Sequence, residues 1–189
     1  PEVLYIGSRP VPKPKKNEVL IKVKAAGVNR PDLLQREGGY PPPKDASDIL
    51  GLEVSGEVVE LGVNTKNIKV GDKVCALVSG GGYSEYCLAP YSQCLPIPKN
   101  MSFEEASTIP ETFFTVWFNL FIRSEVKKNK KILIHGGSSG IGTTAIQFAK
   151  NFGLKVFVTS RSDIKIQNCK RIGADYGVNT KKIDFEKFV

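Results

Sequence analysis

The sequence lacks long apolar runs and lacks the cysteine pairs that commonly bind a structural metal. No window reaches the ~18 consecutive apolar residues of a membrane-spanning helix, so we expect no membrane segment. Its four cysteines are Cys75, Cys87, Cys94 and Cys169, and no two form a C-x-x-C pair. Structural zinc sites are typically built from such pairs, so we expect none and interpret the cysteines as free core thiols.

Internal repeats and low-complexity stretches are also absent, and the composition excludes a disordered chain. Hydrophobic residues make up 41% and charged residues 24% of the 189 residues, enough for one large domain or parts of two. The net charge of +8 comes mainly from short lysine runs at 13–16, 127–131 and 181–182. Because aromatic residues are not interleaved with these runs, we interpret them as solvated lysines and expect no nucleic-acid partner.

The first half of the chain has the pattern of a small, strongly curved β domain. Short strands are predicted at 18–24, 54–61, 74–78 and 83–88, with Gly and Pro turns between them. A short helix follows Asn29, and the stiff loop that ends it contains Tyr40.

Two helices are predicted after Pro98. Ser102 and Glu105 have the spacing of a capping box, and Pro110 is expected to close that helix. An apolar, aromatic helix is then predicted over 112–121 and is expected to be largely buried.

From Lys130 the pattern changes to β-α-β-α-β, which predicts a parallel, doubly wound sheet. A glycine loop, 136–142, joins the first strand to its helix. Although its spacing is not G-x-G-x-x-G, this context favours nucleotide binding, with backbone N–H groups and a helix N-terminus facing a diphosphate. The alternative is a tight turn without a ligand. Gly142 is expected to let the helix approach the first strand closely.

The end of the second strand of this sheet indicates which nucleotide is bound. A site for NADH usually carries a carboxylate there, but none occurs before Asp163. Arg161 and Lys165 are instead able to meet a 2′-phosphate, with Ser162 as a hydroxyl donor. The sequence therefore favours NADPH, and the alternative is that both cations are ordinary surface charges.

Four segments together resemble the zeta-crystallin-like quinone oxidoreductases of the medium-chain dehydrogenase/reductase superfamily: 27–32, 51–56, 70–74 and 135–142. The resemblance covers the chain in the right order. It implies an α/β protein in which a GroES-like β-rich domain with linking helices (1–122) precedes the first half of a Rossmann domain (123–189). It also implies a cytoplasmic location and a homodimer at full length. Because the family's pattern begins before Pro1 and continues past Val189, we expect these residues to be part of a longer chain.

The resemblance also implies the chemistry. Zinc-dependent relatives carry Cys and His where this chain has Asn29 and Leu52, so the metal ligands are lost. The implied activity is zinc-independent hydride transfer from NADPH to a quinone or enone. Glu53 resembles a glutamate behind the active site, and we expect it to be a buried carboxylate with hydrogen-bond partners. Catalytic roles are expected for Asn29 and Tyr40, and cofactor contacts for Asn29, Thr115, Ser139, Gly140, Ile141, Thr159, Arg161, Ser162, Lys165 and Thr180, the last of which replaces a family tyrosine.

Two alternatives remain open at the level of sequence. One is an enoyl or alkenal reductase of the same superfamily, which Asn29 and Tyr40 do not exclude. The other is a noncatalytic protein that binds NADPH and RNA, as the lens-crystallin branch suggests.

Overall fold

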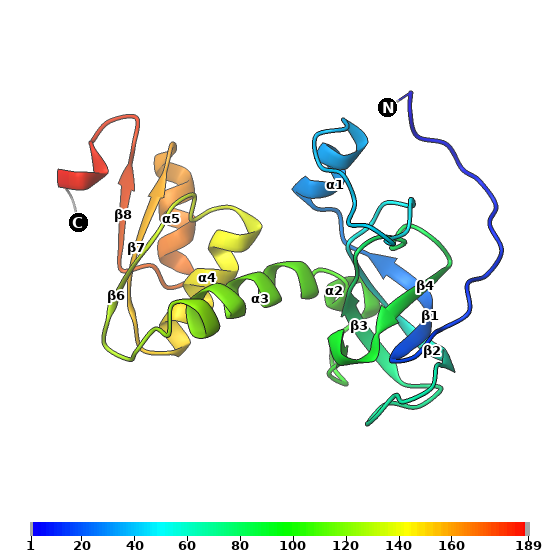
Figure 1. Cartoon of the computed structure of the whole chain (residues 1–189). Helices are drawn as coiled ribbons and strands as arrows, with labels where there is room; N and C mark the ends of the chain where they lie inside the picture. The colour runs from blue at the N-terminus through cyan, green and yellow to red at the C-terminus, as the bar shows by residue number, and fades with distance from the viewer. Residues whose placement is uncertain (1, 188–189) are drawn as a thin grey trace. The chain divides into compact units, whose positions relative to one another are not determined.

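The computed structural model describes residues 2–187, which divide into two compact units between Glu111 and Thr112. In the first unit a five-stranded antiparallel sheet has the strand order β4-β1-β2-β3-β5 (Figure 1). The elements of this unit are β1 (Glu18–Ala26), α1 (Arg30–Arg36), β2 (Glu53–Leu61), β3 (Lys73–Leu77), β4 (Tyr86–Pro90), η1 (Tyr91–Gln93), β5 (Cys94–Pro96) and α2 (Phe103–Ala106).

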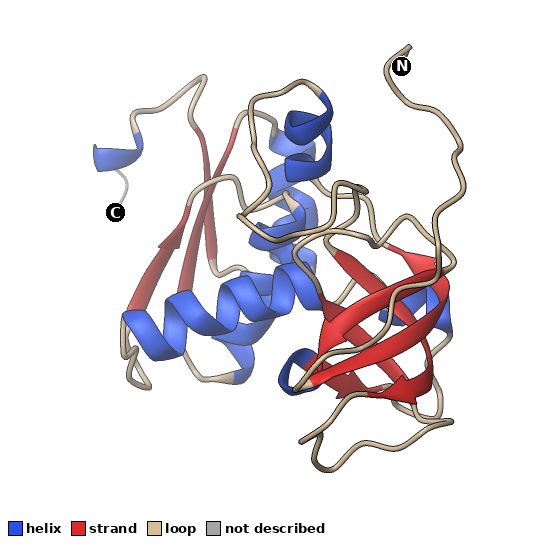
Figure 2. Cartoon of the chain, turned by 45° about the vertical axis from the view of Figure 1, so that its right-hand side comes forward, coloured by secondary structure: helices blue, strands red, loops and turns tan. Residues whose placement is uncertain are grey.

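The sheet of the first unit curves around its own apolar core (Figure 2). Val19 and Ile21 are fully buried, and Lys22 and Lys24 on the opposite face of β1 are exposed, as the alternation predicted, but Leu20 on that second face is also buried. Two register shifts in the pairing of β1 with β2 mark irregularities that bend the ladder. Gly56 in β2 lies so close to β1 that a Cβ would overlap the backbone of Lys22. The glycine that interrupts the strand pattern is therefore a site of close strand approach.

Strand β4 begins later than the sequence indicated. The expected start was Tyr83, but the ladder begins at Tyr86. The Ser84 hydroxyl makes hydrogen bonds to the carbonyls of Gly81 and Tyr86, at 2.6 and 2.8 Å, which fixes a turn before the strand. Side-chain bonds to nearby backbone compete with a strand ladder in this way.

Helix α2 has the predicted capping box. The Glu105 N–H donates to the Ser102 hydroxyl at 3.2 Å, and the Ser102 N–H donates to Glu105 Oε2 at 2.9 Å. The prediction that Pro110 closes this helix was wrong, because α2 ends at Ala106 and Pro110 begins the next helix. A proline is well suited to a first helical turn, where its missing N–H costs no hydrogen bond.

The second unit contains a three-stranded parallel sheet in the order β6-β7-β8, with α4 and α5 as crossover helices (Figure 1). This arrangement is the predicted β-α-β-α-β pattern. The elements are α3 (Pro110–Trp117), the π-helical segment η2 (Phe118–Arg123), β6 (Lys131–Ile134), α4 (Gly140–Asn151), β7 (Lys155–Ser160), α5 (Asp163–Arg171), β8 (Tyr176–Asn179) and η3 (Phe185–Lys187).

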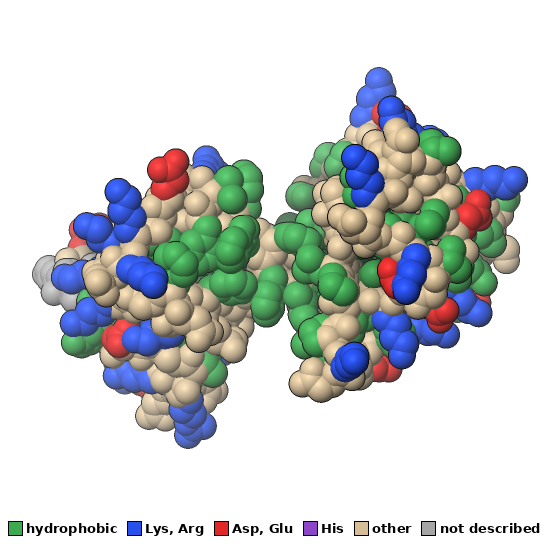
Figure 3. Space-filling view, turned by 90° about the horizontal axis from the view of Figure 1, so that it is seen from below, with side chains coloured by type: hydrophobic (Ala, Val, Ile, Leu, Met, Phe, Trp, Pro, Cys, Tyr) green, Lys and Arg blue, Asp and Glu red, His purple; other side chains and the backbone are tan. Residues whose placement is uncertain are grey.

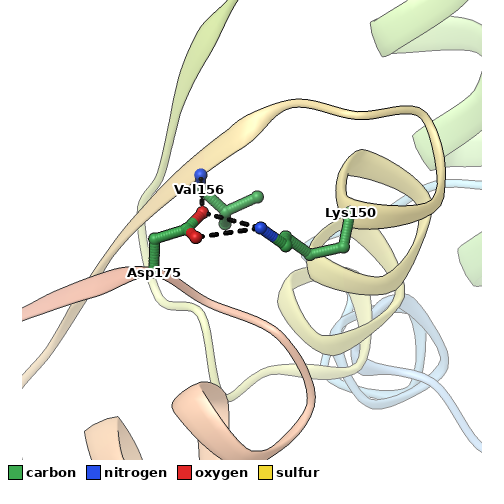
Figure 4. Close-up of polar contacts among 3 residues, drawn as sticks. All are labelled: Lys150, Val156 and Asp175. Carbon is green, nitrogen blue, oxygen red and sulfur yellow. Dashed lines mark hydrogen bonds and ion pairs between the residues drawn. The ribbon is translucent and has the colours of Figure 1, made fainter. Parts of the chain in front are cut away.

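One carboxylate joins α4, β7 and the segment before β8. The two Asp175 oxygens lie 2.9 and 3.0 Å from Lys150 Nζ, and one of them accepts a hydrogen bond from the Val156 N–H at 2.6 Å (Figure 4). The bond from the Val156 N–H is the main reason that the pKa of Asp175 lies below its ordinary value. This contact holds the ends of two strands and a helix in register.

Helix α3 is less buried than expected. Val116 is buried, but Trp117 is 49% exposed, and Phe113 packs edge-on against Phe148 of α4 at 5.2 Å. Because these rings pack on α4, the division between the units falls within α3. The sequence had suggested a boundary after residue 122.

Among residues 2–187 there is no membrane-spanning helix, and the face drawn in Figure 3 carries no continuous basic stripe. None of the helices within residues 2–187 is long and apolar enough to cross a bilayer. On the face shown in Figure 3, Lys and Arg side chains are scattered over both units. The absence of a nucleic-acid partner stays a prediction.

Candidate functional site

Asn29 is the N-cap residue of α1, and its side chain points to a buried carboxylate. Its side-chain amide donates a hydrogen bond to Glu53 Oε1 at 2.8 Å. Its backbone N–H donates to Asp32 Oδ2, also at 2.8 Å. The other Asp32 oxygen accepts from the Gly51 N–H at 3.2 Å. Asn29 is therefore held at both its backbone and its side chain.

Glu53 is 2% exposed and uses both carboxylate oxygens. Oε1 accepts from Asn29, and Oε2 accepts from the Glu111 N–H at the start of α3, at 2.9 Å. Burial is the main cause that raises the pKa of Glu53, and the two hydrogen bonds oppose it. A Cβ at Gly27 would overlap this carboxylate, so the glycine makes room for it. The expected buried carboxylate with partners is confirmed.

Tyr40 lines a pocket of about 200 Å³ within the first unit. Its side chain is 44% exposed. Leu52 lines the same pocket, at the position where zinc-dependent relatives carry a histidine. The lining residues are Gln35, Tyr40, Pro42, Pro43, Leu52, Leu77, Val78, Ser79, Gln93 and Glu111.

This donor set does not fit a zinc ion. Leu52 offers no ligand atom, and the Asn29 amide is hydrogen-bonded to Glu53. Among the described residues, no group of three or more His, Cys, Asp or Glu side chains is arranged to hold a metal.

The glycine loop of the second unit leads into the N-terminus of α4. Ser139 is the N-cap of this helix, and its hydroxyl accepts from the Gly142 N–H at 3.0 Å. Gly140 and Ile141 form the first turn, where backbone N–H groups have no partner inside a helix. Gly142 packs on the loop itself, since a Cβ there would come within 2.5 to 2.7 Å of Gly136 and Gly137. The close approach that Gly142 allows is to the residues that directly follow β6.

Thr115 lies on α3, one turn after a residue that approaches this loop. A Cβ on Gly140 would be 3.5 Å from the methyl group of Thr112, three residues before Thr115 on the same helix. The Thr115 carbonyl accepts a hydrogen bond from Asn119 at 2.8 Å. Its role beside the nicotinamide stays a prediction.

Thr159 is the next-to-last residue of β7 and supports the glycine loop. It is 4% exposed. Its hydroxyl accepts from the Gly136 N–H at 3.2 Å and lies 3.2 Å from His135 Nδ1, while its carbonyl accepts from the Gly137 N–H. These bonds hold the loop to the end of the neighbouring strand, a role that sequence reasoning missed. A contact between Thr159 and the ribose phosphate stays a prediction.

The residues expected at a 2′-phosphate gather where β7 meets α5. Ser162 is the N-cap of α5, but its hydroxyl makes no cap hydrogen bond. Arg161 and Lys165 are exposed, and neither forms an ion pair among residues 2–187. Two exposed cations and a partly buried serine thus lie within five positions of one another at the start of α5.

Asp163, the carboxylate next in sequence to Ser162, is bound to residues outside this group. Asp163 accepts from the Asn179 side-chain amide at 2.9 Å and pairs with Lys182 Nζ at 2.7 Å. The bonds from Lys182 and then Asn179 lower the pKa of Asp163. The negative charge that could repel a phosphate is therefore engaged by partners.

A second cavity, of about 650 Å³, opens at the carboxyl ends of the parallel strands, the edge where doubly wound sheets bind ligands. The Thr180 N–H continues the β7–β8 ladder by donating to Ser160, and the Phe185 ring meets the His135 ring edge-on at 4.9 Å. The lining residues are His135, Thr159, Thr180, Lys181, Lys182, Ile183, Asp184 and Phe185.

Comparison with known proteins agrees with this architecture. The family described as "Alcohol dehydrogenase GroES-like domain" matches residues 15–99, and the family described as "Zinc-binding dehydrogenase" matches residues 140–189. The chain is 35% identical to a quinone oxidoreductase of Sus scrofa, and the match covers 98% of this chain and 57% of that protein. It is 34% identical to the trans-enoyl reductase tndF of Aspergillus flavipes, covering 91% and 54%.

A solved structure of Escherichia coli quinone oxidoreductase complexed with NADPH superposes with a TM-score of 0.83 at 31% identity, covering 97% of this chain and 56% of that one. The two matched families place the chain in the medium-chain dehydrogenase/reductase superfamily, and within it the chain is similar to the zeta-crystallin-like quinone oxidoreductases. It spans little more than half the length of the relatives it matches.

Proposed function

We propose that the protein is a zinc-independent oxidoreductase that transfers hydride from NADPH to a quinone or a related electrophilic acceptor. The pocket of the first unit carries this proposal. Leu52 lines it, and the Asn29 amide is hydrogen-bonded to Glu53, so these two positions supply no ligand for a metal that would polarise a substrate. An acceptor that is already electrophilic needs no such activation.

Residues of the second unit fit NADPH. The first turn of α4 supports binding of the diphosphate, because its unpaired N–H groups and the helix dipole favour an anion. Arg161, Ser162 and Lys165 support binding of the 2′-phosphate, while Asp163 is neutralised by its partners. When bound, NADPH supplies the hydride.

The residues of the first unit orient the acceptor and relay the proton that its reduction requires. Asn29 is fixed by Glu53, so its amide is preorganised beside the reacting groups. Tyr40 lines the pocket, which supports a role for its phenol in hydrogen-bonding an acceptor oxygen. Hydride from bound NADPH would turn a quinone into the hydroquinone monoanion, and one proton from solvent, relayed by the phenol, would complete the neutral hydroquinone.

An enoyl reductase is the second candidate, favoured by the 34% identity to a trans-enoyl reductase. Turnover of NADPH with a naphthoquinone, an alkenal and an enoyl thioester separates the two. We expect the highest kcat/KM with the naphthoquinone. A higher kcat/KM with the thioester would assign the protein to enoyl reduction.

Binding of NADPH without turnover of any acceptor would support a noncatalytic role instead. In that case an affinity for RNA that falls steeply with salt and competes with NADPH is the discriminating observation. The homodimer implied by the family also stays a prediction.

A further inference from the structure

One acidic residue in the acceptor pocket has no part in the mechanism above. Glu111 lines the pocket together with Tyr40 and Leu52. It stands in the first turn of α3, directly after Pro110, and it is half-buried. The sequence pattern did not single it out, because Pro110 was taken as the end of the preceding helix.

The backbone of Glu111 is fixed in place. Its N–H donates to Glu53 Oε2 at 2.9 Å, and Glu53 is itself tied to Asn29. The residue that lines the acceptor pocket is therefore connected through one buried carboxylate to the residue expected beside the nicotinamide.

The surroundings of Glu111 are electrostatically negative. Burial raises the pKa of its carboxyl group, and the charges of Glu53 and Asp32 raise it further. The other pocket residues carry no positive charge: they are apolar or neutral polar side chains. A negatively charged acceptor would therefore meet repulsion with no cation in the pocket wall to offset it.

We propose that Glu111 is a specificity-determining residue, which makes the pocket select uncharged acceptors and reject those that carry a carboxylate or sulfonate next to the reacting ring. This inference rests on the proposed function, because it concerns the acceptor of that reaction. It adds the charge class of the substrate, which neither the fold nor the cofactor site determines.

The test compares a neutral naphthoquinone with its sulfonate at pH 8 and saturating NADPH. We expect Glu111→Gln to raise kcat/KM for the sulfonate by about tenfold, the factor expected when one like charge is removed at short range. With the neutral quinone the value should stay within about threefold. Glu111→Asp keeps the charge and should keep the discrimination, and Glu60→Gln, an exposed position on β2, serves as the control.

Two outcomes are distinguishable. Normal turnover of the neutral quinone with equal effects of Glu111→Gln on both acceptors would overturn the role of Glu111 alone. Absence of turnover with the neutral quinone in the unmodified protein would overturn the proposed function and this inference together. If Glu111→Gln fails to fold, Glu111→Ala removes the same charge and is subject to the same two outcomes.

Discussion

The side-chain amide of Asn29 donates a hydrogen bond to the buried carboxylate of Glu53 across 2.8 Å, although the two residues are 24 positions apart in the chain. The second oxygen of Glu53 accepts from the first turn of α3. One buried side chain thus fixes both the proposed nicotinamide-side residue and the beginning of the helix that carries Glu111 and Thr115.

Replacing Glu53 with Gln should destabilise the protein. The substitution places an NH₂ group opposite one of two N–H donors, so a buried polar group loses its partner at a cost of about 1–3 kcal/mol. Chemical denaturation measures this change in the free energy of unfolding. Glu60→Gln, on the exposed face of the same strand, should change it by less than about 0.5 kcal/mol. Equal effects of both substitutions would show that the Glu53 contacts contribute no stability.

Lys165 should distinguish NADPH from NADH. Lys165→Ala removes a charged partner of the proposed 2′-phosphate, and such charge-assisted bonds contribute about 1.5–3 kcal/mol. The KM for NADPH should rise about tenfold or more, and the KM for NADH should barely change. Lys128→Ala, in an exposed loop, is the control. Parallel changes in both KM values would place the phosphate site elsewhere.

Asp175 should make the stability of the native state fall at acid pH. Its pKa is held below its unfolded value of about 3.9, so the native state gains stability from it above that pH and loses this contribution as pH falls through the lower folded pKa. Asp175→Asn should therefore lower Tm at neutral pH and flatten the dependence of Tm on pH below about 4. The exposed Asp45→Asn should leave both unchanged. If the Tm of Asp175→Asn fell with decreasing pH as steeply as that of the wild type, the role of the Lys150–Asp175 contact would be contradicted.

The cysteines should resist alkylation in the native state. Burial raises the pKa of Cys75 to about 11 and that of Cys87 to about 12, so almost no thiolate exists near neutral pH. Iodoacetamide followed by mass spectrometry should label neither residue before denaturation and both afterwards. Rapid native labelling of Cys87 would mean that the core of the first unit opens readily.

Local patterns explain which parts of the fold could be predicted. The capping box of α2 depends on residues within one element and was read correctly. The alternation in β1 was read correctly for Lys22 and Lys24 but not for Leu20, which is buried. We predicted wrongly that α2 closes at Pro110, because a proline can either follow the end of one helix or begin the next. Strand β5 was missed because three residues ending in a proline carry little periodic signal.

Site residues were predictable where they lie in segments that resemble the family. They were not predictable where their role depends on contacts between residues far apart in the sequence. Glu53 and Glu111 are 58 positions apart, and only the folded sheet brings Glu53 to the start of α3. Thr159 could be placed at the end of a strand, but its hydrogen bonds to the glycine loop depend on the parallel pairing of β6 with β7. A glutamate directly after a helix-starting proline was the available signal for Glu111.

Tyr40 should act on the acceptor more than on the fold, because its half-exposed ring lies in a loop. Tyr40→Phe should leave the free energy of unfolding and NADPH binding unchanged. If the phenol donates the proton in the transition state, quinone turnover should fall by up to ~10²-fold. If the ring only packs against the acceptor, Tyr40→Ala should impair turnover and Tyr40→Phe should not. Unfolding of either variant would reject the assignment.

Hydride transfer from NADPH to a quinone is best examined by single-turnover oxidation of NADPH by a neutral naphthoquinone, with and without deuterium at the transferable position of the cofactor. We expect quinone-dependent oxidation that is slower with the deuterated cofactor, much weaker with NADH, and unaffected by metal chelators. Loss of activity on chelation, an equal rate with NADH, or no quinone-dependent oxidation by protein that binds NADPH would contradict this expectation.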